Sequence, residues 1–225
     1  VDTLQSKLLD AVNSQMHADV PLGVFLSGGV DSSTIAALMQ EKSSKKVKTF
    51  SIGFEDNRYN EAEHAKSVAN HLGTDHHDMY VTSKDTLNVL PLLPDMFDEP
   101  FADSSQIPMY LVSKIAKSKV TVCLSGDGGD ELFGGYDRYY GNRYTDYYAM
   151  VPYAVRRFAF GPALRLLPDG GWYKSKSHQL KWMHRLSFDH GGGRYAKSLG
   201  YFFFGGPMRS HFNGAEMEKV VDGFD

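Results

Sequence analysis

The sequence has little cysteine and no long apolar run, and each shortage excludes a class of protein. Its 225 residues contain one cysteine, Cys123, so neither an intramolecular disulfide framework nor a cysteine-based metal knuckle can form. No apolar run approaches the length of a membrane span, and the first residues carry no signal-peptide pattern. We therefore expect a cytoplasmic protein that makes no contact with a membrane.

The sequence also lacks an excess of positive charge. Lysine and arginine number 24 against 27 aspartates and glutamates, which gives a formal net charge of −3. A nucleic-acid partner therefore has no electrostatic support. The length allows one large domain, or one domain with an appendage. The chain begins at Val1 rather than at a methionine, which leaves open that it belongs to a longer polypeptide.

The stretch from Val24 to Ser33, Val-Phe-Leu-Ser-Gly-Gly-Val-Asp-Ser-Ser, contains the first motif. Its apolar start is typical of a buried strand in a parallel sheet, and the residues after it predict a helix. The two glycines between them allow a tight turn and the close approach of another group. A strand, a glycine turn and a helix start together direct free N–H groups and a helix dipole at one point, which favours phosphate.

No lysine follows these glycines, so the loop is not the nucleoside-triphosphate loop GxxxxGK[ST]. A phosphate held here needs another positive charge. Asp31 offers a hard oxygen ligand, which suggests Mg²⁺ bridging the carboxylate and the phosphate. The alternative is a plain serine- and glycine-rich turn in which Asp31 only caps the helix.

A second stretch, Ser125-Gly126-Asp127-Gly128-Gly129-Asp130-Glu131, repeats this arrangement with more carboxylates. Three acidic residues in five positions repel one another, and a divalent cation would relieve that repulsion. The spacing does not fit an EF-hand. A solvated acidic turn at a helix start is the alternative. Two strand–loop–helix units that each open with Ser-Gly and each carry an aspartate favour a shared function.

Strands and helices alternate along the first part of the chain, which predicts an α/β fold with a parallel sheet covered by helices. Ligands of such sheets bind at the carboxyl ends of the strands, near a topological switch point. If the two strands that precede the loops are close in the sheet, both loops face one crevice. The predicted strands are 24–26, 47–54, 76–81 and 120–124, and the predicted helices are 3–16, 34–39, 61–71, 83–93 and 107–117.

Single residues indicate where some helices begin and end. Asn60 is expected to cap the helix that starts at Glu61, and Gly73 to end it. Ser83 or Asp85 is expected to cap the next helix.

The pattern changes beyond about residue 141, where no further strand is predicted. We expect a core domain at residues 1–145 and a helical extension of it at residues 146–225. The extension is expected to contain helices at 144–167 and 179–188 and glycine breaks at 191–193 and 205–207.

The stretch Leu26–Ser33 resembles the pyrophosphate loop of the ATP-pyrophosphatase (PP-loop) enzymes, which cleave ATP to AMP and pyrophosphate to activate a carboxyl or carbonyl group. The stretch Leu124–Tyr136, preceded by Glu99-Pro100-Phe101-Ala102-Asp103-Ser104-Ser105, looks like the synthetase domain of glutamine-dependent (class B) asparagine synthetases. The resemblance covers residues 1–145 well and the tail weakly. It implies an adenine nucleotide alpha hydrolase-like fold with a helical C-terminal extension that is truncated here.

The resemblance implies ATP and Mg²⁺ as cofactors. Leu26 and Ile52 would contact adenosine, and Asp31 and Asp130 would bind Mg²⁺. The implied catalytic residue is Asp127, at a position where many family members have glutamate; because aspartate is shorter, the identity of the acceptor acid stays open. The implied ATP-binding residues are Leu26, Ser27, Gly28, Gly29, Asp31, Ser32, Ser33, Ile52, Ser125 and Gly126.

The implied substrates are ATP, aspartate and ammonia. Aspartate's side-chain carboxylate would become β-aspartyl-AMP as pyrophosphate leaves, and ammonia would then attack, with Asp127 accepting its proton. In the family, ammonia comes from an N-terminal glutaminase domain with an N-terminal cysteine nucleophile, which Cys123 cannot be. The family's catalytic lysine lies beyond the matched part. We therefore expect weak or no synthetase turnover from this piece alone.

Two other functions stay open. One is a related ATP-pyrophosphatase amidotransferase that acts on another carboxylic acid, polysaccharide-associated or β-lactam-forming, and the other is a catalytically silent nucleotide-binding module. A homodimer is an arrangement that the sequence neither supports nor excludes. His64, His71, His76 and His77 form no convergent tetrahedral set, so we interpret them as ordinary surface or edge histidines rather than zinc ligands.

Overall fold

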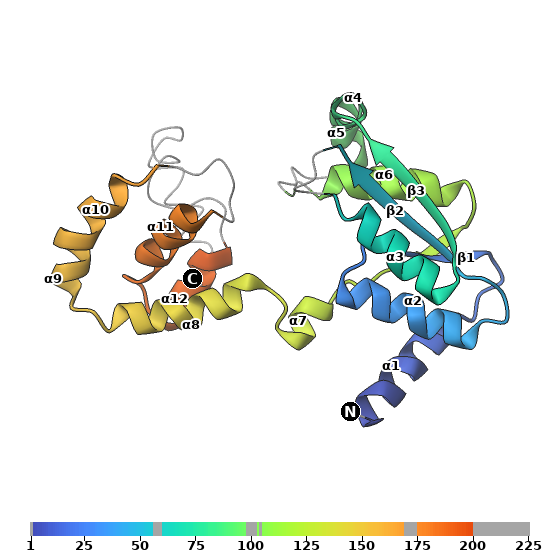
Figure 1. Cartoon of the computed structure of the whole chain (residues 1–225), viewed down its shortest axis with the longest axis horizontal. Helices are drawn as coiled ribbons and strands as arrows, with labels where there is room; N and C mark the ends of the chain where they lie inside the picture. Colours follow the sequence, from blue (N-terminus) through green and yellow to red (C-terminus); the bar gives the residue numbers. More distant parts are fainter. Residues whose placement is uncertain (1, 56–59, 98–102, 104, 169–174, 200–225) are drawn as a thin grey trace. The chain divides into compact units, whose positions relative to one another are not determined.

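The computed structural model describes residues 2–55, 60–97, 103, 105–168 and 175–199. The chain divides into two compact units, residues 1–133 and residues 134–225, which we call the sheet unit and the helical unit (Figure 1). Residue 145, the expected domain boundary, lies within helix α8 (Asp137–Ala149). Among the described residues, no helix is both long enough and apolar enough to cross a bilayer.

The sheet unit contains four parallel strands in the order β3-β2-β1-β4, which confirms the predicted fold class. Central Val24 pairs with Thr49 on one side and with Leu124 on the other. The chain adds β2 and β3 on one side of β1 and then returns to place β4 on the other. The topological switch point therefore lies between β1 and β4. The strands are β1 (Leu22–Phe25), β2 (Lys48–Phe54), β3 (Asp75–Val81) and β4 (Val122–Leu124).

Helices cover both faces of this sheet. On one face, Val24 and Leu26 pack in a cluster with residues of α1, α2 and α3, including Met39. On the other face, α6 packs Val112 against the fully buried Phe50. The helices of the sheet unit are α1 (Asp2–Gln15), α2 (Val30–Lys42), α3 (Ala62–Leu72), α4 (Ser83–Val89), the 3₁₀ turn η1 (Leu90–Leu92), α5 (Leu93–Met96), α6 (Gln106–Lys117) and α7 (Gly129–Phe133).

The structure confirms one predicted helix end and corrects another. Gly73 ends α3 in the left-handed region, with φ of +70°, as predicted. The predicted start of this helix is off by one residue, because α3 begins at Ala62 and its N-cap is Glu61 rather than Asn60. The Asn60 side chain still accepts a hydrogen bond from the Ala62 N–H (3.2 Å). Neither Ser83 nor Asp85 is the N-cap of α4, because the extended residue before the helix is Thr82, but Asp85 takes part in the cap from the third helical position. The Thr82 hydroxyl accepts from the Asp85 N–H (3.2 Å), and the Asp85 carboxylate accepts from the Thr82 N–H (2.9 Å).

The described residues of the helical unit form helices and no strand, as predicted. The expected glycine break at 191–193 is wrong, because Gly191 begins α12 (Gly191–Leu199). Buried Arg194 fixes this helix, since it forms an ion pair with Asp146 of α8 and donates to the Asp189 carbonyl (2.8 Å). The expected break at 205–207 lies outside the described residues. The other helices are α9 (Tyr153–Val155), the π-helical turn η2 (Arg156–Phe160), α10 (Gly161–Arg165) and α11 (Lys176–Leu186).

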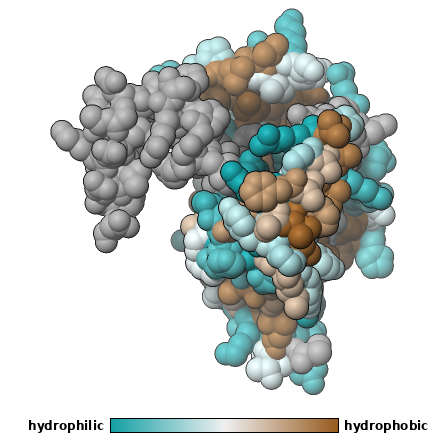
Figure 2. All heavy atoms as spheres, turned by 90° about the vertical axis from the view of Figure 1, so that its left-hand side faces the viewer, coloured by the Kyte–Doolittle hydropathy of each residue, from teal (hydrophilic) through white to brown (hydrophobic). Residues whose placement is uncertain are grey.

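Large hydrophobic side chains are exposed on the helical unit. Figure 2, which turns the left-hand side of Figure 1 toward the viewer, shows brown side chains at the surface of this unit. Met150 is 80% exposed, Phe158 74% and Leu166 87%.

A polar network lies within the sheet itself, where His76 of β3 contacts two buried side chains of β2. Its Nδ1 lies 2.8 Å from the Thr49 hydroxyl and its Nε2 lies 3.3 Å from the Ser51 hydroxyl. Burial lowers the pKa of His76 below the usual 6.5, against the opposing charge of Asp78. Folding therefore favours the neutral form of the His76 imidazole, whereas in the unfolded chain this imidazole takes up a proton at its ordinary pKa.

This difference predicts a pH dependence of stability. The free energy of unfolding is expected to fall as the pH is lowered from neutrality through 6.5, because the unfolded chain then binds more protons than the folded one. His76→Gln should flatten this part of the curve. Exposed His71 supplies the matched control, and His71→Gln should keep the slope. Urea denaturation between about pH 5.5 and 7.5 measures it, and an unaltered slope in His76→Gln would contradict the assignment.

Candidate active site

The two glycine-rich loops leave the sheet from neighbouring strands. Gly23 of β1 pairs with Cys123 of β4, and both strands run in the same direction. Ser27 and Ser125 therefore follow strand ends that lie side by side, at the switch point where α/β sheets bind ligands. Burial raises the pKa of the Cys123 thiol to about 11, so this side chain is not a reactive thiolate at neutral pH.

The loops also contact each other directly, through two glycines of the second loop. A Cβ on Gly126 would lie 2.7 Å from the Ser32 nitrogen, and a Cβ on Gly129 would lie 2.5 Å from Cγ of Asp31. Neither position has room for a side chain. The Asp31 carboxylate therefore lies against the first residue of α7, and Asp130, the other predicted metal ligand, is the next residue of that helix.

The first loop is closed by its own serines. The Ser27 and Ser32 hydroxyls lie 2.9 Å apart, and the Gly29 N–H donates to the Ser27 hydroxyl (3.2 Å). The Ser33 hydroxyl is buried and has no hydrogen-bond partner within the described part of the chain. Gly28 adopts a φ of +82°. These residues make a compact turn whose hydroxyls and N–H groups surround the start of α2.

The 13-residue helix α2 begins directly after this turn. Its N-cap is Gly29, which provides no side-chain cap for the N–H groups of the first turn. Free N–H groups and the positive end of the helix dipole together favour an anion. The phosphate site at this turn stays a prediction.

The second loop carries the predicted catalytic carboxylate at the surface. Asp127 is exposed, and its carboxylate accepts a hydrogen bond from the Ser125 hydroxyl (2.9 Å). Gly128, with φ of +88°, follows it and turns the chain into α7. This hydrogen bond fixes the position of the Asp127 side chain beside the strand end from which the loop leaves.

The two predicted adenosine contacts lie in different hydrophobic clusters. Leu26 is 1% exposed and packs under α2 and α3, and its N–H donates to the Phe50 carbonyl (2.8 Å). Ile52 is half-buried and packs on the face covered by α6. Leu26 is therefore closed to a ligand in this structure, whereas Ile52 is partly exposed. Their roles toward adenosine stay predictions.

One wall of the site was not predicted from the sequence. A Cβ on Gly28 would lie 2.7 Å from the Ala65 nitrogen and 2.8 Å from the His64 carbonyl carbon, so the first turn of α3 packs directly against the loop. The alanines along this face of α3 are the feature of the sequence that could have predicted this close contact. In the other predicted stretch, residues 99–102 and 104 lie outside the described residues, while the Asp103 carboxylate accepts from the Ser105 N–H (2.8 Å).

The chain is similar to several known proteins that share the name glutamine-hydrolysing asparagine synthetase. Putative glutamine-hydrolysing asparagine synthetase 2 of Methanocaldococcus jannaschii is 44% identical over 150 residues, which cover 66% of this chain and 29% of the relative. Glutamine-hydrolysing asparagine synthetase 1 of Bacillus subtilis is 39% identical over 170 residues, 76% of this chain and 27% of the relative. A putative glutamine-hydrolysing asparagine synthetase of Mycobacterium bovis is 34% identical over 99% of this chain and 31% of its own length.

The chain thus spans about 30% of the length of these relatives. A solved NH3-dependent NAD synthetase from Campylobacter jejuni aligns over 60% of each chain with 17% identity and a TM-score of 0.42, a likeness that carries no information about the reaction. The sequence profile of the asparagine synthase family matches residues 3–198 and so includes both loops. The chain therefore belongs to the asparagine synthase family.

Proposed function

We propose that this chain is the ATP-activating part of an amide-forming ligase. It would convert the side-chain carboxylate of aspartate to β-aspartyl-AMP with release of pyrophosphate. Ammonia would then attack the activated carbonyl carbon, and asparagine would form as AMP leaves and a proton is lost from the nitrogen. The observation that carries the proposal is the contact of Gly126 and Gly129 with Asp31, which joins two Ser-Gly loops into one site. Membership of the asparagine synthase family supports aspartate as the acceptor.

The first loop would hold the phosphates of ATP. In this proposal, the N–H groups at the start of α2 and the hydroxyls of Ser27 and Ser32 would donate hydrogen bonds to phosphate oxygens, and the buried Ser33 hydroxyl would do so only after a local rearrangement. As the α-phosphorus is attacked, negative charge grows on the departing pyrophosphate. Donors fixed before the reaction stabilise that charge without having to reorganise.

We propose Asp31 and Asp130 as ligands of the Mg²⁺ that this reaction would use. Gly129 leaves space for the Asp31 carboxylate, and both residues supply hard oxygen ligands. Within the described residues, no group of three or more histidines, cysteines and acidic side chains could hold a metal by itself. Two carboxylates that share Mg²⁺ with phosphate oxygens and water match its usual coordination. The ion would neutralise charge on the leaving pyrophosphate.

Asp127 would act in the second step as the base that accepts a proton from the attacking ammonia. Its exposure leaves it accessible to a substrate, and the bond from Ser125 orients it. We propose that the ammonia comes from a glutaminase part of the parent protein, since the relatives are named glutamine-hydrolysing and this chain covers about 30% of their length.

Exchange of labelled pyrophosphate into ATP tests the activation step. In the parent protein, exchange is expected to require aspartate and Mg²⁺, whereas this chain alone should bind Mg-ATP and exchange weakly or not at all. A panel of carboxylic acids provides the control for the acceptor. Exchange that responds to another acid but not to aspartate would change the substrate, and nucleotide binding without exchange in the parent protein would indicate a silent binding module.

A further inference from the structure

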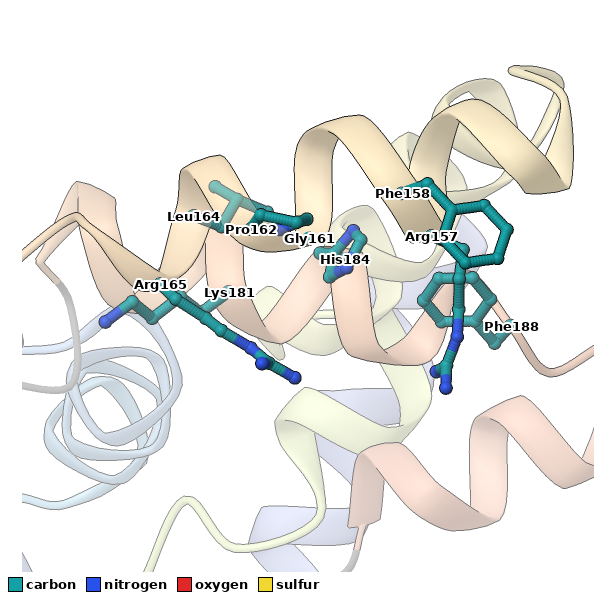
Figure 3. Close-up of a pocket in the computed structure, with 9 residues that line it drawn as sticks. All are labelled: Arg157, Phe158, Gly161, Pro162, Leu164, Arg165, Lys181, His184 and Phe188. Atoms are coloured by element: carbon teal, nitrogen blue, oxygen red, sulfur yellow. The ribbon is translucent and has the colours of Figure 1, made fainter.

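The helical unit contains an open cavity of about 580 Å³ bordered by η2, α10 and α11 (Figure 3). This volume falls in the range of about 300–1,000 Å³ that is usual for small-molecule sites. The cavity lies in a different unit from the two glycine-rich loops. Its basic and aromatic lining residues, which define what we call the arginine pocket, are Arg157, Phe158, Arg165, Lys181, His184 and Phe188.

The arginine pocket has positive charge, and none of the described residues that line it is acidic. In the described parts of the chain, neither Arg157 nor Arg165 forms an ion pair, and Figure 3 shows both side chains extending to the same side with His184 between them. The Lys181 ammonium donates to the Leu167 carbonyl (2.9 Å). Burial, together with the charge of Arg156, lowers the pKa of His184, so the charge that an anion would meet comes from Arg157, Arg165 and the Lys181 ammonium.

The surroundings strengthen this positive potential. Arg156 is 5% exposed and lies over the Phe188 ring (5.0 Å to its centre), where it donates to the Ser187 carbonyl and hydroxyl rather than to a carboxylate. The described residues 134–168 and 175–199 contain 10 lysines and arginines against 3 aspartates. Such an excess of positive charge raises the local concentration of anions.

The aromatic side chains of the arginine pocket also favour a ligand that carries a planar ring next to its anionic group. Phe158 is 74% exposed at the cavity, so its face is available for stacking. A guanidinium binds phosphate or carboxylate oxygens through two parallel hydrogen bonds. We propose that the arginine pocket binds a small anion in which a phosphate or carboxylate is joined to a planar ring, with Arg157 and Arg165 on the anionic group and Phe158 on the ring.

Titration with phenyl phosphate, followed by the NMR signals of the arginine side-chain Nε–H groups, tests the proposal. The Arg157 and Arg165 signals are expected to shift, and Arg157→Gln and Arg165→Gln should each weaken binding by about tenfold. Arg143→Gln removes an exposed arginine of α8 outside the pocket and should change the affinity by less than about twofold. Phe158→Leu should remove the preference for phenyl phosphate over inorganic phosphate.

Two further measurements show which anionic group binds and at which of the two sites it binds. Benzoate in place of phenyl phosphate shows whether a carboxylate serves as well, and either anion supports the proposal if it shifts the pocket arginines. If the amides of Gly28 and Gly29 shift while the pocket arginines do not, phosphate binds only at the first loop and the proposal fails. It also fails if Arg143→Gln weakens binding as much as the pocket variants, or if the parent protein shields the pocket arginines without any ligand.

Discussion

Replacing Gly28 by alanine is expected to lower the stability of the sheet unit by about 3 kcal/mol, through two separate costs. The first is backbone strain, because Gly28 has a φ of +82°. The second is overlap, because a Cβ would lie 2.7 Å from the Ala65 nitrogen, and helix backbone cannot move aside as a flexible side chain can. Native-state hydrogen exchange of the Leu26 amide, which donates to the Phe50 carbonyl, measures the loss locally.

Gly73 provides a matched control for this prediction. It has a φ of +70°, but a Cβ there would meet nothing within 4 Å. Gly73→Ala should therefore cost only the strain, about 1 to 2 kcal/mol. Equal losses at the two positions would show that the packing of α3 against the first loop does not matter for stability.

Removing the charge of Asp31 is expected to weaken binding of Mg-ATP by about a hundredfold, because the substitution Asp31→Asn keeps the shape of the side chain but supplies a poor metal ligand. Gly129→Ala should weaken binding in the same direction without changing any ligand. Its Cβ would lie 2.5 Å from Cγ of Asp31 and would displace the carboxylate. Isothermal titration calorimetry with Mg-ATP and with metal-free AMP measures both effects.

The two ligands distinguish a metal-binding defect from unfolding. Metal-free AMP should bind to Asp31→Asn as it does to the unaltered chain, since the predicted role of Asp31 is toward the metal. Asp10→Asn, which removes an exposed carboxylate from α1, should leave both affinities unchanged. Undiminished Mg-ATP binding by Asp31→Asn would refute the role proposed for the contact between the two loops.

The order of strands and helices could be predicted because local signals and packing agree along most of the sheet unit. The run from Val47 to Phe54 alternates between the two faces of a helix-covered sheet, and Gly73 has the left-handed conformation expected at a helix end. The cap of α4 was misassigned because Thr82, Ser83 and Asp85 are all good capping residues. Only the extended backbone of Thr82 decides among them.

The glycines at 191–193 show where local signals fail. Three consecutive glycines normally interrupt a helix, yet α12 begins at Gly191. Arg194 forms an ion pair with Asp146, which is 48 residues away in the sequence. No local pattern reveals a contact of that separation, so the tertiary interaction overrides the propensity.

The candidate site was predictable in its parts but not in its assembly. Both loops were identified from their Ser-Gly starts and aspartates, and the parallel sheet implied that they meet. The sequence could not indicate that Gly126 and Gly129 pack closely against Asp31, because a glycine at either position could equally have been required by the backbone conformation of the loop. Nor could it show that the Leu26 side chain is buried, since a residue at the end of a strand can face the core or a ligand.

The pairing of Leu22 with Val122 determines when, during folding, the proposed nucleotide site can form. The partners are one hundred residues apart, so a polypeptide still emerging from the ribosome has the first loop long before the strand that completes the crevice. Such late, non-local pairing is slow. Affinity for the nucleotide would thus arise in the final stage of folding, and the bound nucleotide would in turn hold the last strand in place.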